Sequence, residues 1–418
     1  MSPSLLVAGG GIGGLAAALA AARRGWQPRV FEQAARLSEA GAGIQLGPNA
    51  CRVLRSWSLL DGVRTHACVP RRLVARDVSS GRELASLDIG REFEARYGAP
   101  YLTIHRADLH DALAQALRGA GVVPHTGLRA VGLSQEVAGV QLSLAPVSAT
   151  SACAAGAAGP STGGDAPAVR DEWGEAAVAA DGLWSTLRQQ LLGDGPPLAS
   201  DHVAYRSLLP MIDVPARWRE PEVTAWMGPD LHVVTYPVRG GEALNVVCVV
   251  QQASAGERTG WDHPAARAAV LAALGNACTA LRDLVEAAPA WGLWVLHDRP
   301  AVQSAGAMAQ GRVALLGDAA HPMRPYLAQG AAMALEDAAV LGDVLGEALA
   351  PGGGRTLAAP EALARYAQLR WQRCARVQRR SLRNGGIFHA SGIMRIARDA
   401  GLRGLGGRLM DVPWLYRG

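Results

Sequence analysis

The chain has no lysine: all 41 basic residues among its 418 are arginines. A mechanism that needs a side-chain amine, such as Schiff-base formation, is therefore excluded. The six cysteines show no C-x-x-C spacing and the ten histidines no metal-ligand spacing, so we expect reduced thiols and no bound metal. No run of about 18 apolar residues occurs, which predicts no membrane span. The N-terminus lacks the basic region and cleavage site of a signal peptide, which predicts a cytoplasmic protein.

Positive charge is concentrated near the C-terminus. Residues 352–418 hold thirteen arginines against three acids, Glu361, Asp399 and Asp411. Such a segment could bind nucleic acid or an anionic membrane. It has no interleaved aromatic residues and no nucleic-acid motif, so we favour a helix whose arginines pair with the acidic body of the protein. We expect no nucleic-acid partner.

A glycine-rich segment near the N-terminus has the pattern of a dinucleotide-binding turn. It follows the apolar run 5–8 and opens an Ala/Leu-rich helix that begins at Ile12. In the pattern G-x-G-x-x-G, Gly9 allows the tight turn, Gly11 lets the backbone approach a pyrophosphate, and Gly14 lets the helix pack closely on the strand. The free N–H groups at the start of the helix then bind the anion.

Glu32 ends the next predicted strand, about 20 residues after the glycines. A carboxylate at this position accepts hydrogen bonds from an adenosine ribose and disfavours a 2′-phosphate. The sequence therefore predicts a site for FAD or NAD rather than NADP.

Two later segments place further polar groups at strand ends. Asp181-Gly182 follows the small-residue strand 176–180, and Gly317-Asp318 follows the apolar run 313–316. Either carboxylate could bind ribityl or ribose hydroxyls. The helix start at Gly330 and Ala331 could offer N–H groups to a reduced isoalloxazine ring. A plain Asp-Gly turn and an ordinary helix cap are the alternative interpretations.

The order of predicted elements indicates an α/β protein: a discontinuous, Rossmann-like FAD-binding domain, an inserted and mostly antiparallel β-sheet domain for the substrate, and C-terminal helices. The predicted FAD-binding segments are 1–70, 106–200 and 295–375. The predicted substrate-binding segments are 71–105 and 201–294, and the C-terminal helical segment is 376–418. The low-complexity stretch 146–168 predicts a surface loop.

Further motifs join these in one order along nearly the whole chain: Gly41-Ala42-Gly43-Ile44, His105-Arg106-Ala107-Asp108-Leu109, Trp226-Met227-Gly228-Pro229 and the run from Leu315 to Leu341. Together they resemble the single-component FAD-dependent aromatic hydroxylases, the group of salicylate hydroxylase, 3-hydroxybenzoate 6-hydroxylase and 6-hydroxynicotinate 3-monooxygenase. The resemblance implies bound FAD, with NADH rather than NADPH and O2 as co-substrates. It also implies hydroxylation of a phenolic aromatic acid through a C4a-hydroperoxyflavin. A homodimer is one possible assembly.

The resemblance also implies roles for single residues. Arg106 matches an arginine that contacts the ribityl–pyrophosphate side of the flavin, and Gly43 lies in a matching cofactor-binding motif. Asp181 matches a residue that serves FAD and the pyridine nucleotide, and Asp318 matches the ribityl-binding aspartate. An FAD-dependent epoxidase or hydroxylase of a larger secondary metabolite would carry the same motifs and is the alternative.

Attack on the ring is easier on a phenolate than on a phenol, so the protein should supply a base. His232 and Tyr236 lie four apart on one strand, so they share a face, and the resemblance associates this pair with activation of the substrate hydroxyl. His321 is a third candidate, for orienting substrate or NAD(P)H. The alternatives are an exposed His232 with a core Tyr236, and a structural His321. For the substrate we expect contacts from Tyr326, and charge from Arg324 or Arg206.

Overall fold

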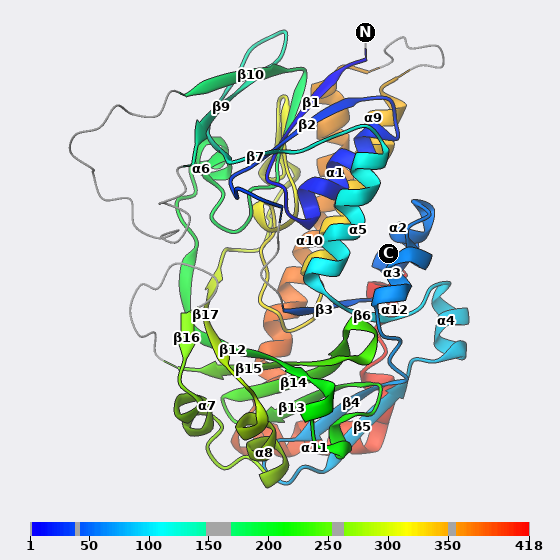
Figure 1. Cartoon of the computed structure of the whole chain (residues 1–418), viewed down its shortest axis with the longest axis vertical. Coiled ribbons are helices and arrows are strands. Elements are labelled where there is room, and N and C mark those ends of the chain that lie inside the picture. Colours follow the sequence, from blue (N-terminus) through cyan, green and yellow to red (C-terminus); the bar gives the residue numbers. More distant parts are fainter. Residues whose placement is uncertain (1, 38–41, 148–168, 253–262, 350–356, 418) are drawn as a thin grey trace, which may run out of the picture.

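The computed structural model describes residues 2–37, 42–147, 169–252, 263–349 and 357–417. Most of the loop predicted over 146–168 lies outside these residues, as does Gly41. The described part forms two bodies, one above the other in Figure 1, and a long helix runs from one to the other through the middle of the view. The predicted α/β architecture with an inserted sheet is confirmed. None of the described helices is both long and apolar enough to cross a membrane.

The nucleotide body is built on a six-stranded sheet in the order β18-β19-β11-β1-β2-β7. All neighbours are parallel except β18 and β19. Its central strands consist almost entirely of buried residues, as expected for a parallel sheet covered on both faces. The strands are β1 (Ser4–Ala8), β2 (Gln27–Glu32), β7 (His125–Thr126), β11 (Ala176–Ala179), β18 (Ala309–Gln310) and β19 (Val313–Leu315).

Three helices, α1 (Ile12–Ala22), α5 (Arg106–Gly119) and α9 (Gly330–Glu347), lie together beside this sheet (Figure 1). Small residues let α1 and α9 approach closely, since a Cβ added at Gly342 would lie 2.8 Å from Ala20 Cβ. A three-stranded antiparallel sheet, β10-β9-β8, also packs against the nucleotide sheet. Its strands are β8 (Leu128–Gln135), β9 (Val140–Pro146) and β10 (Arg170–Gly174).

The second body is an eight-stranded sheet in the order β16-β17-β12-β15-β14-β13-β4-β5. Its pairs are antiparallel except β13 with β4. The helices α7 (Arg267–Ala273) and α8 (Thr279–Ala287) cover one face of it, and the other faces the nucleotide body (Figure 1). The strands are β4 (Arg72–Asp77), β5 (Glu83–Asp88), β12 (Leu198–Pro210), β13 (Glu222–Gly228), β14 (Leu231–Val238), β15 (Ala243–Gln251), β16 (His263–Ala265) and β17 (Trp291–Asp298).

The long helix α10 (Ala359–Phe388) joins the two bodies. It packs on α9 and β19 at the nucleotide end, and the residue after it, His389, accepts a hydrogen bond from Asp230 N beside β14. It runs without interruption through residue 376, where the sequence predicts that the C-terminal segment begins. The two-stranded pair β3 (Gly43–Leu46) and β6 (Leu102–His105) lies between the bodies.

Shorter helices complete the described fold: α2 (Pro48–Ser56), α3 (Leu60–His66), α4 (Arg91–Tyr97), α6 (Thr186–Leu192), α11 (Gly392–Leu405) and α12 (Pro413–Tyr416). Four arginines of the basic C-terminal segment pair with acids outside that segment: Arg365 with Glu347, Arg370 with Glu336 and Asp337, Arg373 with Glu336, and Arg395 with Asp77. These pairs are the arrangement that we favoured for the segment.

Candidate active site

The turn between β1 and α1 has room for backbone only. Gly9 has a φ of +104°, and a Cβ there would lie 2.3 Å from Ala180 O. A Cβ at Gly14 would lie 1.9 Å from Gly9 O, so α1 can pack on β1 only with glycine at this position. Gly11 is the N-cap and offers no side chain, so the first N–H groups of the helix, starting at Ile12, have no side-chain cap. This cradle fits the pyrophosphate of a dinucleotide.

Glu32 holds the rim of the same turn. Its Oε2 accepts a hydrogen bond from Gly10 N at 2.6 Å and its Oε1 accepts one from Ala34 N at 2.7 Å. Each carboxylate oxygen keeps a second lone pair, which a ribose hydroxyl can use. The structure thus brings Glu32 to the glycine turn, as the motif predicts.

Asp318 and the start of α9 also come together. A Cβ added at Gly330, the first residue of α9, would lie 4.0 Å from Asp318 Oδ1. Gln329 gives the helix no side-chain cap, so the N–H groups of its first turn, which includes Ala331, are available to an acceptor. A carboxylate for hydroxyls and a helix start for electron-rich atoms therefore stand side by side.

A buried and unsatisfied oxygen of Asp181 is the clearest structural indication of a ligand site near the glycine turn. Its Oδ2 accepts from Leu187 N at 3.3 Å, while its Oδ1 is buried and has no hydrogen-bond partner in the described part of the chain. Burial raises the pKa of this carboxyl, against the hydrogen bonds that lower it. A buried acceptor without a donor suits a ligand hydroxyl. With the glycine cradle, these residues fit FAD.

Gly43 ties the nucleotide body to the substrate sheet. Its N–H donates to Asn245 Oδ1 and its carbonyl accepts from the Tyr236 hydroxyl, both at 2.7 Å. A Cβ at Gly43 would lie 2.6 Å from the Tyr236 ring. Its partner in the β3–β6 register is His105, which places Arg106, the first residue of α5, beside this junction.

These contacts change the role expected of Tyr236. Its hydroxyl is bonded to the backbone of Gly43 inside the protein, and burial raises its pKa. A hydroxyl held in this way joins two elements and is poorly placed to relay a substrate proton. We therefore treat Tyr236 as a positioning residue rather than as a group that itself activates the substrate hydroxyl.

His232 does share the face of Tyr236, and it is 1% exposed. Its Nδ1 lies 2.7 Å from Nε2 of His389, the residue at the C-terminal end of α10. Neutral His232 can therefore donate from Nδ1 to His389, which leaves Nε2 as the basic nitrogen. His389 was not predicted as a site residue, because 157 residues separate it from His232 and no local pattern joins them.

Burial keeps both histidines neutral. Burial, and next the neighbouring His389, lower the pKa of His232 well below its ordinary value. Burial, and next His202, lower the pKa of His389 to about 4. At neutral pH both imidazoles are therefore unprotonated, the state that a proton acceptor needs.

Tyr326 lies against this histidine pair. Its ring centroid is 5.2 Å from that of His232 and 5.8 Å from that of His389. The hydroxyl is buried and makes no hydrogen bond to the residues that the structure describes. His202, which was not predicted as a site residue either, stacks on His389 with ring centroids 5.2 Å apart. It shares the face of Arg206 at the strand period of two, and that pattern could have revealed it.

The two candidate arginines differ in what they contact. Arg324 pairs through Nε with both oxygens of Asp298, at 2.9 and 2.8 Å, and its Nη1 lies 3.0 Å from His202 Nδ1. Its charge is thus already balanced, and we no longer expect it to bind a substrate anion. Arg206 stands 5.0 Å over the Trp294 ring, on the sheet face that also carries His232.

His321 does not join the other candidates. It is 1% exposed, and its Nε2 bonds Asp337 Oδ2 in the interior of the nucleotide body. Burial alone would lower its pKa, but the Asp337 carboxylate outweighs burial and the pKa is raised well above the ordinary value. Asp337 in turn bonds Arg370 at 2.7 Å. This is the environment of a structural histidine, so we withdraw the catalytic assignment of His321.

The cluster of His321, Asp337 and Cys374 has the geometry of a possible metal site. The carboxylate of this cluster, Asp337, is already paired with the Arg370 guanidinium, which also pairs with the neighbouring Glu336. A cation there would meet that fixed positive charge. We assign no metal to the cluster.

Fold and site together define a flavoprotein that brings a dinucleotide cofactor to a histidine-bearing substrate sheet. The family model described as "FAD binding domain" matches residues 3–381, so the chain belongs to the FAD-binding domain family. It is 36% identical over 420 residues to 3-hydroxybenzoate 6-hydroxylase of Polaromonas naphthalenivorans. The aligned region covers 99% of this chain and 95% of the relative. The protein is an FAD-dependent monooxygenase.

Two further similarities agree with this assignment. The chain is 34% identical over 346 residues to 6-hydroxynicotinate 3-monooxygenase of Bordetella bronchiseptica, over 81% of this chain and 82% of the relative. A substrate complex of salicylate hydroxylase superposes with a TM-score of 0.78 at 23% identity, over 100% of this chain and 96% of that one. At that identity the likeness shows the fold alone.

Proposed function

We propose that the protein hydroxylates a small aromatic acid that carries a ring hydroxyl, a hydroxybenzoate or a hydroxypyridine carboxylate, with NADH as reductant. The single observation that carries the proposal is the buried pair His232–His389 on the substrate sheet. The relatives named for 3-hydroxybenzoate and 6-hydroxynicotinate support it, because both names describe a ring with a hydroxyl and a carboxylate. Bound FAD supplies the activation of O2.

The chain's own residues divide the remaining work. His232 Nε2 accepts the proton of the ring hydroxyl, which leaves the more electron-rich phenolate. Neutral His389, whose Nε2 accepts from His232 Nδ1–H, holds the His232 ring in the tautomer whose Nε2 is the proton acceptor. Burial of both rings and of Tyr326 excludes water from the proton transfer.

Arg206 is the cation that we assign to the substrate carboxylate. In the sheet register it pairs with Val247, which pairs with Val234, two residues along β14 from His232. β15 lies between β12, which carries Arg206, and β14, which carries His232, so these two strands are two strand spacings apart, about 10 Å. Side chains of this length can close that span around one aromatic ring.

The test measures NADH oxidation, O2 uptake and product mass together, with FAD-loaded protein and a panel of hydroxybenzoates and hydroxynicotinates. A substrate should stimulate all three and gain one oxygen atom. The same panel with NADPH compares kcat/KM for the two reductants, and we expect the higher value with NADH. Acceleration of H2O2 release alone by every compound would contradict the proposal.

His232→Gln tests the residue that carries it. Loss of a general base should lower the hydroxylation rate by roughly 10²–10⁴-fold, while FAD remains bound. His66→Gln is the matched control, because His66 is exposed at the end of α3. Equal coupled turnover in the two variants would remove His232 from the mechanism.

A further inference from the structure

A second cavity lies on the other face of the substrate sheet. It has a volume of about 540 Å³ and is bounded by β13, β14, the start of α8 and the short 3-10 helix η2 (Ala216–Trp218). Thr235 lines it, whereas its neighbours His232 and Tyr236 face the nucleotide body. The cavity and the candidate active site therefore lie on opposite faces of the sheet at β14.

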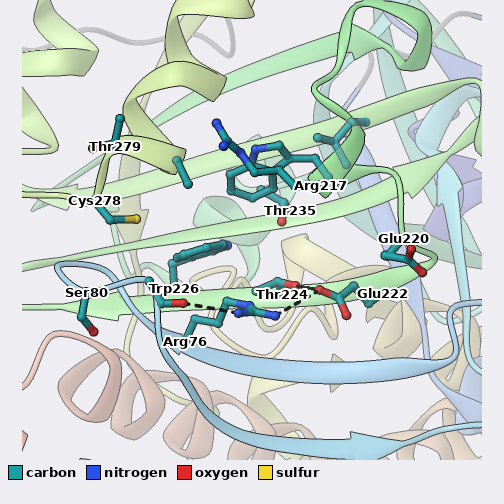
Figure 2. A pocket seen from close by; sticks show the side chains of 14 residues that line it. Arg76, Ser80, Arg217, Glu220, Glu222, Thr224, Trp226, Thr235, Cys278 and Thr279 are labelled. Carbon is teal, nitrogen blue, oxygen red and sulfur yellow. Dashed lines mark hydrogen bonds and ion pairs between the residues drawn. The ribbon is translucent and has the colours of Figure 1, made fainter.

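Two tryptophans line the cavity, Trp218 and Trp226, of which Figure 2 labels Trp226. Trp218 and Trp226 are 8% and 6% exposed, and their ring centroids lie 5.1 Å apart at 41°. Neither indole N–H has a hydrogen-bond acceptor among the residues that the structure describes. Buried donors are nearly always paired in folded proteins, so two adjacent exceptions that line one cavity point to an acceptor supplied from outside the chain.

A helix start contributes to the same cavity. α8 has nine residues, and its N-cap, Cys278, gives no side-chain cap to the first turn, where Thr279 lines the cavity. A Cβ added at Gly81 would lie 3.4 Å from Cys278 Sγ and 3.8 Å from the Trp226 ring. The helix start and the indole wall are therefore adjacent, and the partial positive charge of the helix end favours an anion.

The charged side chains at the cavity permit an anion as well. Arg76 stands 5.6 Å over the Trp226 ring and pairs with Glu83 at 3.3 Å, and Arg217, at the exposed rim, pairs with Asp283 (Figure 2). Glu222 is held by Arg72 at 3.2 Å and by Arg76 at 3.9 Å, so its charge is balanced. Glu220 is exposed. A cationic ligand would leave both indole N–H groups without an acceptor.

We propose that this cavity is a second binding site, for a small aromatic carboxylate. The carboxylate oxygens accept from the indole N–H groups and the first turn of α8, and the ring packs against the indoles. The site does not rest on the proposed hydroxylation, because none of its residues faces the nucleotide body.

Equilibrium dialysis of the FAD-loaded protein with radiolabelled benzoate tests the site. The flavin absorption spectrum, recorded in parallel, reports occupancy of the active site. We expect benzoate binding that leaves the flavin spectrum unchanged. Trp218→Phe and Trp226→Phe keep a ring but remove the N–H donor, and each should weaken that binding by roughly tenfold.

Trp173→Phe is the matched control, since Trp173 lies exposed on β10 of the nucleotide body. Unfolding midpoints of the three variants verify that each is folded. Three results would each overturn the proposal: all bound benzoate perturbs the flavin, the cavity variants bind like Trp173→Phe, or benzylamine binds more tightly than benzoate.

Discussion

At the scale of single residues, Gly9 and Gly14 keep the first turn close to its neighbours, and His389 contacts His232 on the substrate sheet. The motif predicts Gly9 because the local turn needs its φ of +104°, and Gly14 because a Cβ there would meet the carbonyl of Gly9, only five residues earlier. The period of two in a strand likewise put His232 and Tyr236 on one face. It could not show that the Tyr236 hydroxyl is bonded to Gly43, or that His389 arrives from the end of α10, because both contacts join distant segments.

Gly14→Ala is predicted to weaken FAD binding by at least tenfold. The added Cβ would lie 1.9 Å from Gly9 O, so α1 must move away from β1 and its N–H groups leave the pyrophosphate position. The dissociation constant of FAD, from fluorescence of the released flavin, measures the effect. Gly62→Ala in α3 is the control, since a Cβ there meets nothing within 4 Å. Equal FAD affinity in both variants would refute the steric argument.

At the scale of elements, the Ala/Leu-rich composition of α1 and the apolar run that contains β19 made both elements predictable. The sequence did not predict what holds α9 to α10. That interface buries Glu336, Asp337 and Arg370, whose guanidinium is 2.8 Å from Glu336 and 2.7 Å from Asp337. From the sequence, charged residues in a helix predict a face exposed to solvent. Only the packing of α9 on α10 shows that these three are buried and paired with one another.

Arg370→Met should therefore destabilise the protein by about 3–5 kcal/mol, because it removes a buried cation that pairs with both Asp337 and Glu336. Arg365→Met on the same helix is the control. Arg365 pairs with Glu347 at the surface, and its loss should cost less than about 1 kcal/mol. Urea unfolding gives both values. A similar decrease in the free energy of unfolding in both variants would contradict a larger contribution from the buried ion pairs of Arg370.

At the scale of the whole molecule, the stability should depend on acid in a defined range. The pKa of His389 is about 4 in the folded protein, against an ordinary value of 6.5, and that of His232 is lowered as well. Between these values the unfolded chain binds more protons than the folded one. Stability from the neutral pair is therefore present above about pH 6.5 and is lost as the pH falls towards 4.

We predict that the urea midpoint falls as the pH is lowered from 6.5 to 4, and that His389→Gln reduces this fall. Asp337, with a pKa of about 2 despite its burial, adds its loss only at still lower pH. The midpoints at pH 7.5, 6, 5 and 4 measure the slope, with His66→Gln for comparison. A slope that is the same in both variants would contradict the assignment of a buried, neutral His389.

The order of strands in the nucleotide sheet also has a consequence for synthesis of the chain. β1 pairs with β11, and β11 pairs with β19, so neighbours in space come from the beginning, middle and late part of the sequence. At roughly 5–20 residues per second, a ribosome needs on the order of 7–27 s between β11 and β19. During that interval the edge of β11 has no strand to pair with, and an unpaired edge favours aggregation. Newly made chains therefore depend on protection of this edge until β19 emerges.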